Sequence, residues 1–342
     1  MSDPAIGTAT TRPLAAFAMR PDLPGQLFSE RDRERLAAAL QIDTSATIQD
    51  FALLSPERMA ELEVLITGWG SPHIGEPELA AMPKLRAVIH AAGTVKGHID
   101  DAAWDRGIRV TSAAAANAVP VAEYTLAMIL LAGKGVPGYI RGYSRALDAY
   151  TDAADPRVGN YQRTIGIVGA SRVGRRVIEL LDPFDFTVLL YDPQLPPGDP
   201  VLGFARSASL TEIFASSSIV SVHAPLLPET RGMIGSELLE LLPPGATLIN
   251  TARAPIVDQD ALETAVRDRG LRAILDVTDP EPLPLDHPLR AHPDVVLTPH
   301  VAGALGNELR RLGESAVHEV ERFVAGEPAE HPVTKDALVA VA

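Results

Sequence analysis

The sequence predicts an α/β fold of two doubly wound domains, each with a parallel sheet between two layers of helices. Short apolar runs alternate with helix-like stretches along most of the chain, as in proteins built from βαβ units. The length of 342 residues suffices for two domains, each with its own core. In addition, residues 163–174 read R-T-I-G-I-V-G-A-S-R-V-G, in which an apolar strand passes through a glycine turn into a helix.

The first part of the chain contains four predicted strands, in apolar runs that begin at Leu14, Val64, Leu85 and Ile108. Between the first two runs, Ser29 is placed to cap a helix over residues 31–40, and Ser55-Pro56 opens a second helix. This βα alternation indicates a first α/β domain that ends soon after the fourth strand.

A long helical pattern follows Pro120 and leads into a stretch with Gly and Pro up to Asn160, which looks like a connection between the domains. Six further strands are predicted at 164–168, 187–192, 219–224, 246–252, 272–278 and 295–301. The last long helix, from Gly306 to Ala325, is expected to return the chain to the first domain.

We therefore expect a discontinuous, flavodoxin-like substrate-binding domain from residues 1–118 and 305–342. Residues 119–304 are expected to form a Rossmann-like dinucleotide-binding domain. In such folds ligands bind at the carboxyl ends of the strands. The active site is accordingly expected in a cleft between the two domains.

The glycine turn carries the signature of a dinucleotide site. Gly169 suits the tight turn, Gly174 lets the helix approach the sheet, and the N–H groups between them face a pyrophosphate. Ser171 replaces the second glycine of the usual pattern, and there it either crowds the site or donates a hydrogen bond. Asp192 follows roughly 20 residues later, where a carboxylate binds the ribose hydroxyls and repels a 2′-phosphate. This favours NAD over NADP, unless Asp192 merely caps a turn with Pro193.

Composition excludes several other classes of protein. The net charge of −14 disfavours binding to nucleic acid or to an anionic membrane surface. The chain has no cysteine, which rules out disulfides and thiolate nucleophiles and fits a reducing compartment. No signal peptide is evident, and the apolar runs look too short to span a membrane. We therefore expect a cytoplasmic protein, and because the histidines lack metal-ligand spacing we expect no metal.

Three polar residues stand where apolar strand segments give way to loops. They are Arg253 after A-T-L-I-N-T-A, Glu281 after I-L-D-V-T-D-P and His300 after V-V-L-T-P. Together they supply what reversible hydride transfer at a carbinol needs. The arginine can hold a carboxylate bidentately, the histidine can transfer a proton near neutral pH, and the glutamate can orient it. Taken singly, such an arginine usually forms a salt bridge at the surface, and such a histidine usually has a structural role.

Motifs in the order Y-D-P, V-H-A-P-L-L-P-E-T-R-G, N-T-A-R-A-P-I-V-D-Q-D-A-L, D-V-T-D-P-E-P-L-P and T-P-H-V-A-G follow the glycine turn. This series resembles the D-isomer-specific 2-hydroxyacid dehydrogenases, the group that contains phosphoglycerate dehydrogenase and glyoxylate reductase. The resemblance is strong from about Leu85 to Gly303, whereas the residues up to about Gly70 share only the βα rhythm.

The resemblance implies an NAD-dependent oxidoreductase of small 2-hydroxy or 2-oxo acids, and it implies a homodimer. By this resemblance Arg253 binds substrate, Glu281 pairs with the histidine and His300 is the acid and base. The implied cofactor-binding residues are Gly169, Ser171, Arg172, Val173, Asp192, His223, Pro225, Thr251, Ala252 and Asp276. Among these, Asp276 is expected to hold the nicotinamide carboxamide. The backbone amides of Gly93 and Thr94 are expected to receive the substrate carboxylate.

This chain departs from the family pattern at two places. After Gly93 the family carries Asp-Asn where this chain has Lys96-Gly97-His98, so Lys96 adds a positive charge that suits a second acidic group. Ala254-Pro255 replace two glycines and stiffen the segment after Arg253. Glu281 itself is retained, which disfavours formate as substrate, because formate dehydrogenases of similar sequence lack a carboxylate there.

Two alternatives remain open from the sequence. The first is an NADH-sensing interaction protein, like the corepressors built on this family fold, with little turnover. The second is a phosphite-type dehydrogenase.

Overall fold

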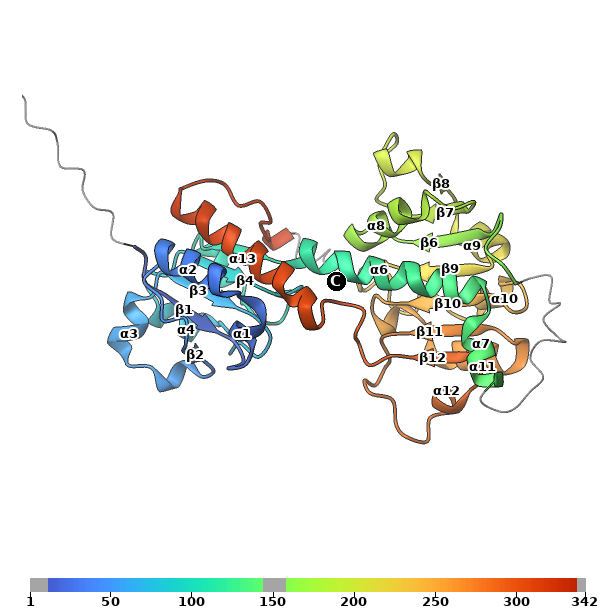
Figure 1. Cartoon of the computed structure of the whole chain (residues 1–342), viewed down its shortest axis with the longest axis horizontal. Coiled ribbons are helices and arrows are strands. Elements are labelled where there is room, and N and C mark those ends of the chain that lie inside the picture. Colours follow the sequence, from blue (N-terminus) through green and yellow to red (C-terminus); the bar gives the residue numbers. More distant parts are fainter. Residues whose placement is uncertain (1–11, 144–157, 337–342) are drawn as a thin grey trace, which may run out of the picture. The chain divides into compact units, whose positions relative to one another are not determined.

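The computed structural model describes residues 12–143 and 158–336. Its described residues form two compact units, the first from 12–117 and 306–336, the second from 118–143 and 158–305. Each unit contains a parallel sheet with helices on both of its faces (Figure 1). The predicted α/β class is therefore confirmed, and the chain leaves the first unit and later returns to it.

The sheet of the first unit has the strand order β2-β1-β3-β4-β5, which is the flavodoxin-like order. Its strands are β1 (Ala15–Ala18), β2 (Thr47–Ile48), β3 (Val64–Thr67), β4 (Ala87–His90) and β5 (Arg109–Ser112). Its helices are α1 (Leu23–Leu27), α2 (Glu30–Ala39), α3 (Pro56–Glu61), α4 (Glu76–Ala81), α5 (Ala102–Asp105) and α13 (Leu309–Val324), with short 3-10 turns η1 (Phe51–Leu53) and η4 (Gly306–Glu308). The edge strand β2 is missing from the predicted strands, because a strand of two residues is too short to show an alternation of apolar and polar side chains.

Serine caps begin two helices of this unit as the sequence predicts. Ser29 accepts a hydrogen bond from the N–H of Asp32, whose carboxylate accepts in return from the N–H of Ser29. Ser55 accepts from the N–H of Arg58 at the start of α3. These bonds satisfy backbone donors that have no partner inside the helix. The two helix starts are thus fixed by local chemistry that the sequence displays.

The two faces of the first sheet bury different side chains. Ala18, Leu65 and Val88 pack with the helices α3, α4 and α5. Phe17 points to the opposite face, where its ring stacks on Phe28 with 5.1 Å between the centroids. On that side α13 packs against α1, α2 and β4. The segment that returns after residue 305 therefore completes the core of the first unit.

The second unit has the strand order β12-β11-β10-β9-β6-β7-β8, which Figure 1 shows from bottom to top. Its strands are β6 (Thr164–Val168), β7 (Thr187–Tyr191), β8 (Arg206–Ser207), β9 (Ile219–Val222), β10 (Thr247–Asn250), β11 (Arg272–Leu275) and β12 (Val295–Leu297). From β6 the chain builds outward to β7 and β8 and then returns to the other side of β6 with β9. A parallel sheet binds its ligand at such a switch point.

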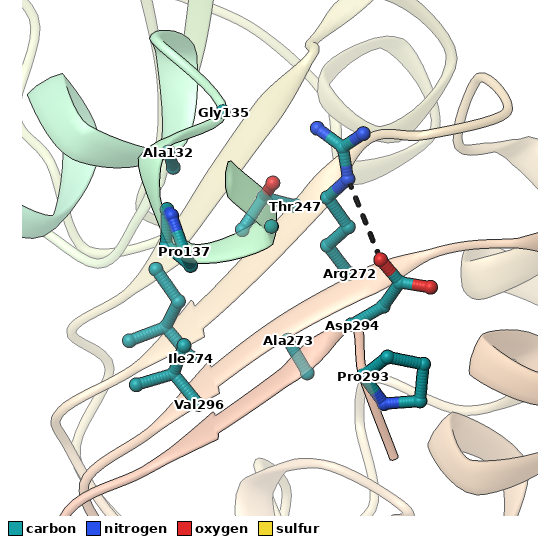
Figure 2. A pocket seen from close by; sticks show the side chains of 11 residues that line it. Ala132, Gly135, Pro137, Thr247, Arg272, Ala273, Ile274, Pro293, Asp294 and Val296 are labelled. Carbon is teal, nitrogen blue, oxygen red and sulfur yellow. Dashed lines mark ion pairs between the residues drawn. The ribbon is translucent and has the colours of Figure 1, made fainter. Parts of the chain in front are cut away.

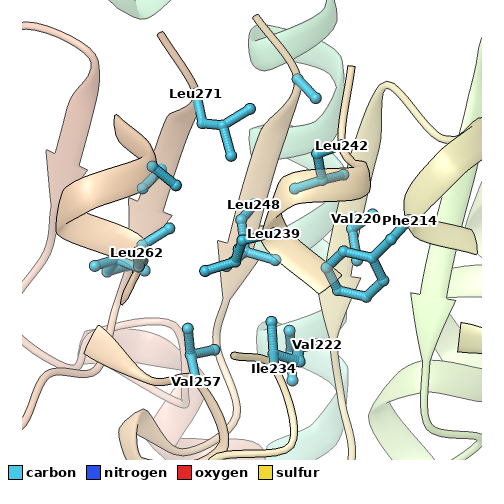
Figure 3. Close-up of a cluster of buried hydrophobic side chains, with 14 of the residues drawn as sticks. Phe214, Val220, Val222, Ile234, Leu239, Leu242, Leu248, Val257, Leu262 and Leu271 are labelled. Carbon is cyan, nitrogen blue, oxygen red and sulfur yellow. The ribbon is translucent and has the colours of Figure 1, made fainter. Parts of the chain in front are cut away.

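Helices cover both faces of this sheet: α6 (Ala114–Gly133), α7 (Val136–Tyr143), α8 (Arg172–Leu181), α9 (Leu210–Ser216), α10 (Ser236–Leu241), α11 (Gln259–Arg269) and α12 (Pro288–Ala291), with 3-10 turns η2 (Pro200–Gly203) and η3 (Ala254–Ile256). One core contains side chains of α9, α10 and α11 (Figure 3). The other contains side chains of α6 and α8. Successive strand residues alternate between the two, as Leu248 and Ile249 do.

Two expectations for the region after residue 113 are wrong. α6 already begins at Ala114 and contains Pro120, because the run A-A-A-N-A before the proline has high helix propensity. The stretch after α6 does not connect the units, since its described residues belong to the second unit and include the helix α7. Residues 144–157 of this stretch lie outside the described residues.

Among the described helices, α6 alone is long and apolar enough to cross a membrane. From the sequence alone, we expect no run of that length. In the structure Ala122, Ile129 and Ala132 of α6 pack into the core of the second unit.

Candidate active site

The glycine turn after β6 requires glycine at both expected positions. Gly169 has a φ of 102°, and a Cβ there would lie 2.5 Å from the backbone nitrogen of Ala224. A Cβ at Gly174 would overlap the carbonyl oxygen of Gly169. The turn therefore brings the start of α8 close against the ends of β6 and β9, at the switch point of the sheet. This cradle fits the pyrophosphate of a dinucleotide.

Ser171 caps α8 rather than crowding the turn. Its Oγ accepts a hydrogen bond from the N–H of Gly174 at 3.3 Å. Arg172 and Val173 are the first residues of the helix, so their backbone N–H groups belong to its first turn. The departure from the glycine pattern is thus explained by helix capping, which a serine performs well.

Asp192 lies at the end of β7 beside the glycine turn. Its Oδ2 accepts from the N–H of Ala170 at 2.7 Å and its Oδ1 from the N–H of Gln194 at 2.8 Å. The carboxylate therefore caps the turn after β7, as one interpretation of the sequence has it. The same two bonds hold it next to the glycine turn, where the other interpretation places the ribose.

His223 lies behind the glycine turn and is fully buried. Its Nε2 shares a hydrogen bond of 2.9 Å with the Oγ of Ser221. Burial lowers the pKa of His223 to about 3, so the ring is neutral at physiological pH. The next residue, Ala224, contacts Gly169 through its backbone, and Pro225 follows it. His223 thus lies in the wall that supports the turn.

His90, at the end of β4 in the first unit, is buried in the same way. Its Nδ1 shares a hydrogen bond of 2.8 Å with the Oγ1 of Thr67. Burial, and after it the neighbouring His98, lower the pKa of His90 to about 3. Each unit therefore buries one neutral histidine in its sheet.

These two histidines make stability depend on pH. Above pH 6.5 both rings are neutral in the folded and the unfolded chain; between 6.5 and about 3 only the unfolded chain binds their protons. The free energy of unfolding should therefore fall on acidification within this window, by about 1.4 kcal/mol per pH unit for each histidine. Urea denaturation at about pH 7.5 and 5.5 measures this. Equal stability at both pH values would contradict this prediction. As a control, H318N removes an exposed histidine and should leave the pH dependence unchanged.

The loop after β10 carries Arg253 and is folded by Asn250, which is buried. The Oδ1 of Asn250 accepts from the N–H of Ala252, and its Nδ2 donates to the carbonyl of Arg253, both at 3.0 Å. The guanidinium of Arg253 donates to the carbonyl of Ala252 at 2.7 Å. Burial lowers the pKa of Arg253 from its ordinary value, and Glu281 acts against that shift. Asn250 is a site residue that the sequence interpretation missed.

The loop after β12 carries His300 and is held by Asp276, which follows β11. The carboxylate of Asp276 accepts from the N–H of Val301 at 2.8 Å, the N–H of Ala302 at 2.9 Å and the Oγ1 of Thr298 at 2.6 Å. Its backbone carbonyl accepts from the N–H of His300 at 2.9 Å. His300 has a φ of 55°, so a tight turn presents its ring. Asp276 therefore shapes this loop, and its expected contact with the nicotinamide stays a prediction.

His300 and Glu281 form a close pair. The Nδ1 of His300 lies 2.8 Å from the Oε1 of Glu281, and about half of each side chain is exposed. A carboxylate only accepts hydrogen bonds, so Nδ1 carries a proton and Nε2 is left for a ligand. Arg253 follows β10 at the same carboxyl edge of the sheet, and Glu281 acts on its pKa. The structure thus pairs His300 with Glu281 directly and places Arg253 at the same edge.

Gly93, Thr94 and Lys96 lie in the first unit, in the loop after β4. The N–H of Lys96 donates to the Oγ1 of Thr94 at 3.2 Å, which bends this loop. Lys96 is exposed, and Gly93 and Thr94 are half-buried. Both follow the carboxyl end of β4, and their expected role in binding the substrate carboxylate stays a prediction.

Figure 2 shows a pocket at the opposite, amino-terminal edge of the second sheet, where Arg272 and Asp294 face each other at 3.9 Å. Its cavity of about 20 Å³ is large enough for a water molecule and too small for a substrate. Among the described residues no group of three or more His, Asp or Glu side chains is arranged to hold a metal ion.

Residues 126–302 match the family of D-isomer specific 2-hydroxyacid dehydrogenases, in the part described as the NAD binding domain. D-3-phosphoglycerate dehydrogenase of Mycobacterium tuberculosis is 34% identical over 253 residues, which are 73% of this chain and 47% of that protein. The chain thus spans about half the length of such relatives. Formate dehydrogenase of Arabidopsis thaliana is 30% identical over 293 residues, 83% of this chain and 76% of that protein.

Glyoxylate reductase of Thermofilum pendens is 34% identical over 266 residues, 75% of this chain and 77% of that protein. The crystal structure of a phosphoglycerate oxidoreductase from Rhizobium etli superposes with a TM-score of 0.82 at 25% identity, and the match covers 96% of this chain and 100% of that one.

Proposed function

This chain belongs to the D-isomer specific 2-hydroxyacid dehydrogenase family, and we propose that it reduces a small 2-oxo acid at C2. Its cofactor is NAD, which supplies or accepts the hydride. The observation that carries the proposal is the pair of His300 and Glu281, 2.8 Å apart, beside the loop of Arg253. A half-exposed imidazole with one nitrogen held by a carboxylate is suited to pass a proton through the other.

His300 would deliver this proton from Nε2 to the oxygen on C2 during reduction and would take it back during oxidation. Glu281 would orient the ring through its hydrogen bond to Nδ1. Arg253 would hold the substrate carboxylate with its planar guanidinium and polarise the neighbouring carbonyl. The amides of Gly93 and Thr94 would bind the same carboxylate, and Lys96 would favour substrates with a second acidic group.

The glycine turn, with Ser171, Arg172 and Val173 at the start of α8, would bind the pyrophosphate. Thr251, Ala252 and Asp276 would lie by the nicotinamide, and His223 and Pro225 would line the same side of the site. These assignments rest on the geometry of the loops at the carboxyl ends of β6, β9, β10 and β11, together with the motifs at those positions.

Asp192 is proposed to select NADH over NADPH. Asp192→Ala should weaken NADH binding about tenfold by removing a charged hydrogen-bond acceptor from the ribose. The same change should leave NADPH binding equal or improved, because it removes a repelling charge. Fluorescence titration with both cofactors measures this. Equal weakening of both would assign Asp192 to the turn alone; D182A, at the far end of α8, is the matched control.

The test of the whole proposal is NADH oxidation with glyoxylate, pyruvate, hydroxypyruvate, phenylpyruvate and 2-oxoglutarate as separate substrates. Turnover of any of them supports the reductase. NADH binding without turnover would favour a sensing role, and phosphite-dependent NADH formation would favour the phosphite-type reaction. We further propose a cytoplasmic homodimer, which sedimentation analysis of the purified protein tests for its oligomeric state.

A further inference from the structure

Two consecutive residues of α6 contact the two loops of the site. The Oη of Tyr124 lies 2.7 Å from the Oγ1 of Thr298, in the loop after β12. The Oγ1 of Thr125 lies 3.1 Å from the Oγ1 of Thr251, in the loop after β10. Thr298 precedes His300 by two residues and Thr251 precedes Arg253 by two residues. One turn of a single helix therefore touches both loops at equivalent positions.

The direction of the first contact follows from its neighbours. Thr298 donates its one hydroxyl proton to the carboxylate of Asp276 at 2.6 Å, so the hydroxyl of Tyr124 must donate to Thr298. Burial raises the pKa of Tyr124, which keeps its proton in place at neutral pH. Asp276 in turn accepts from the backbone of Val301 and Ala302 on the other side of His300. The chain of bonds from Tyr124 thus reaches both flanks of His300.

The second contact is buried. Thr125 has no exposed surface, and Thr251 is 8% exposed. A hydrogen bond between two buried hydroxyls is costly to leave unmade, because neither group can reach water instead. After Thr251, the backbone of Ala252 and Arg253 is held by hydrogen bonds to the side chain of Asn250. The loop of Arg253 is thus tied to α6 at its start and to β10 through Asn250.

We propose that Tyr124 and Thr125 are positioning residues, Tyr124 for His300 and Thr125 for Arg253. This inference rests on the proposed function, because it takes His300 as the acid and base and Arg253 as the group that binds the substrate carboxylate. The two hydroxyls then act on different kinetic constants. Loss of the Tyr124 hydroxyl disturbs the proton step, whereas loss of the Thr125 hydroxyl disturbs substrate binding.

The test compares Tyr124→Phe and Thr125→Val, which remove one hydroxyl each and keep the shape of the side chain. Y124F should lower kcat about tenfold and leave KM for the oxo acid within about twofold of the parent protein. T125V should raise that KM about tenfold and leave kcat within about twofold. T125S, which keeps the hydroxyl, should have the KM of the parent protein. The matched controls are Y139F, on α7, and T247V, at the opposite end of β10 from Thr251; both should change neither constant.

A structural role alone predicts a different result. It would lower the midpoint of thermal unfolding and impair kcat and KM together in each variant. T125S would then be no better than T125V, and that outcome overturns the inference. Parent-like kinetics in both Y124F and T125V overturn it as well.

Amide hydrogen exchange separates this test from the test of the function, since it needs no substrate. Y124F should accelerate exchange about tenfold in residues 298–302 and leave residues 251–256 unchanged, and T125V should do the reverse. If no oxo acid is turned over, the proposed function fails, and the exchange pattern still decides whether these hydroxyls hold the loops. Unchanged exchange in both loops refutes the inference even in an active enzyme.

Discussion

Replacing His300 with Asn is expected to lower kcat about a thousandfold while the Kd for NADH stays within about twofold. The imidazole is the group that transfers the proton in the proposed reaction, and losses of this order are typical when a general acid is removed. The cofactor contacts proposed above involve other residues, so NADH binding should persist. Steady-state kinetics with the best oxo acid, together with fluorescence titration of NADH, measure the two quantities.

The chain offers a matched control for this experiment. His318 on α13 forms a pair with Glu330 at 3.0 Å, and its side chain is half-exposed like that of His300. H318N should therefore leave kcat unchanged, although it removes a histidine–glutamate pair of similar geometry. If H300N lost NADH binding, or kept kcat within about tenfold, His300 would not be the proton donor. Glu281→Gln should give an intermediate loss, since the ring remains but its orienting charge is removed.

Replacing Arg253 with Lys is expected to raise KM for the oxo acid about a hundredfold and to lower kcat as well. A lysine keeps the charge but offers no planar fork, so it can neither hold the carboxylate bidentately nor polarise the carbonyl from the same position. The loop should stay folded, because Asn250 binds backbone groups of Ala252 and Arg253 rather than the guanidinium. Initial-rate kinetics and a thermal unfolding curve check both statements.

An exposed arginine serves as the control for Arg253. Arg206 pairs with Glu212 at the surface, so R206K should leave both kinetic constants and the unfolding temperature unchanged. An unchanged KM in R253K would show that the substrate carboxylate is bound elsewhere, with the loop of Gly93 and Thr94 as the next candidate.

The sequence predicts the fold class well, and it predicts which residues lie at the carboxyl ends of strands, because both depend on local patterns. Gly169 and Gly174 can be recognised from their spacing, and the structure shows that a Cβ at either position would clash. Ser29 and Ser55 mark helix starts through bonds to residues three positions later. Arg253 and His300 each lie three residues after an apolar strand, so their place near the strand ends can be read from the chain.

The supporting residues could not be predicted in this way, because their contacts join distant parts of the chain. Tyr124 and Thr298 are 174 residues apart, and Thr125 and Thr251 are 126 residues apart. Nothing in the pattern of α6 distinguishes these hydroxyls from ordinary helix residues. Asn250 lies inside a motif that the sequence displays, but its hydrogen bonds to Ala252 and Arg253 exist only once the loop has folded. The roles of all the selected site residues, from Arg253, Glu281 and His300 to Lys96, Asp192 and Asp276, remain predictions.

The discontinuity of the first unit has a consequence for synthesis on the ribosome. Residues 118–305 form a continuous unit and leave the ribosome before residue 306, whereas the first unit lacks α13 until Val324 has been synthesised. Until then Phe17 and Phe28 have no helix α13 beside them, and Gly313 cannot settle on the carbonyl of Leu27. The first unit thus begins synthesis before the second unit and is completed after it, and its exposed apolar face during that interval invites chaperone binding and aggregation.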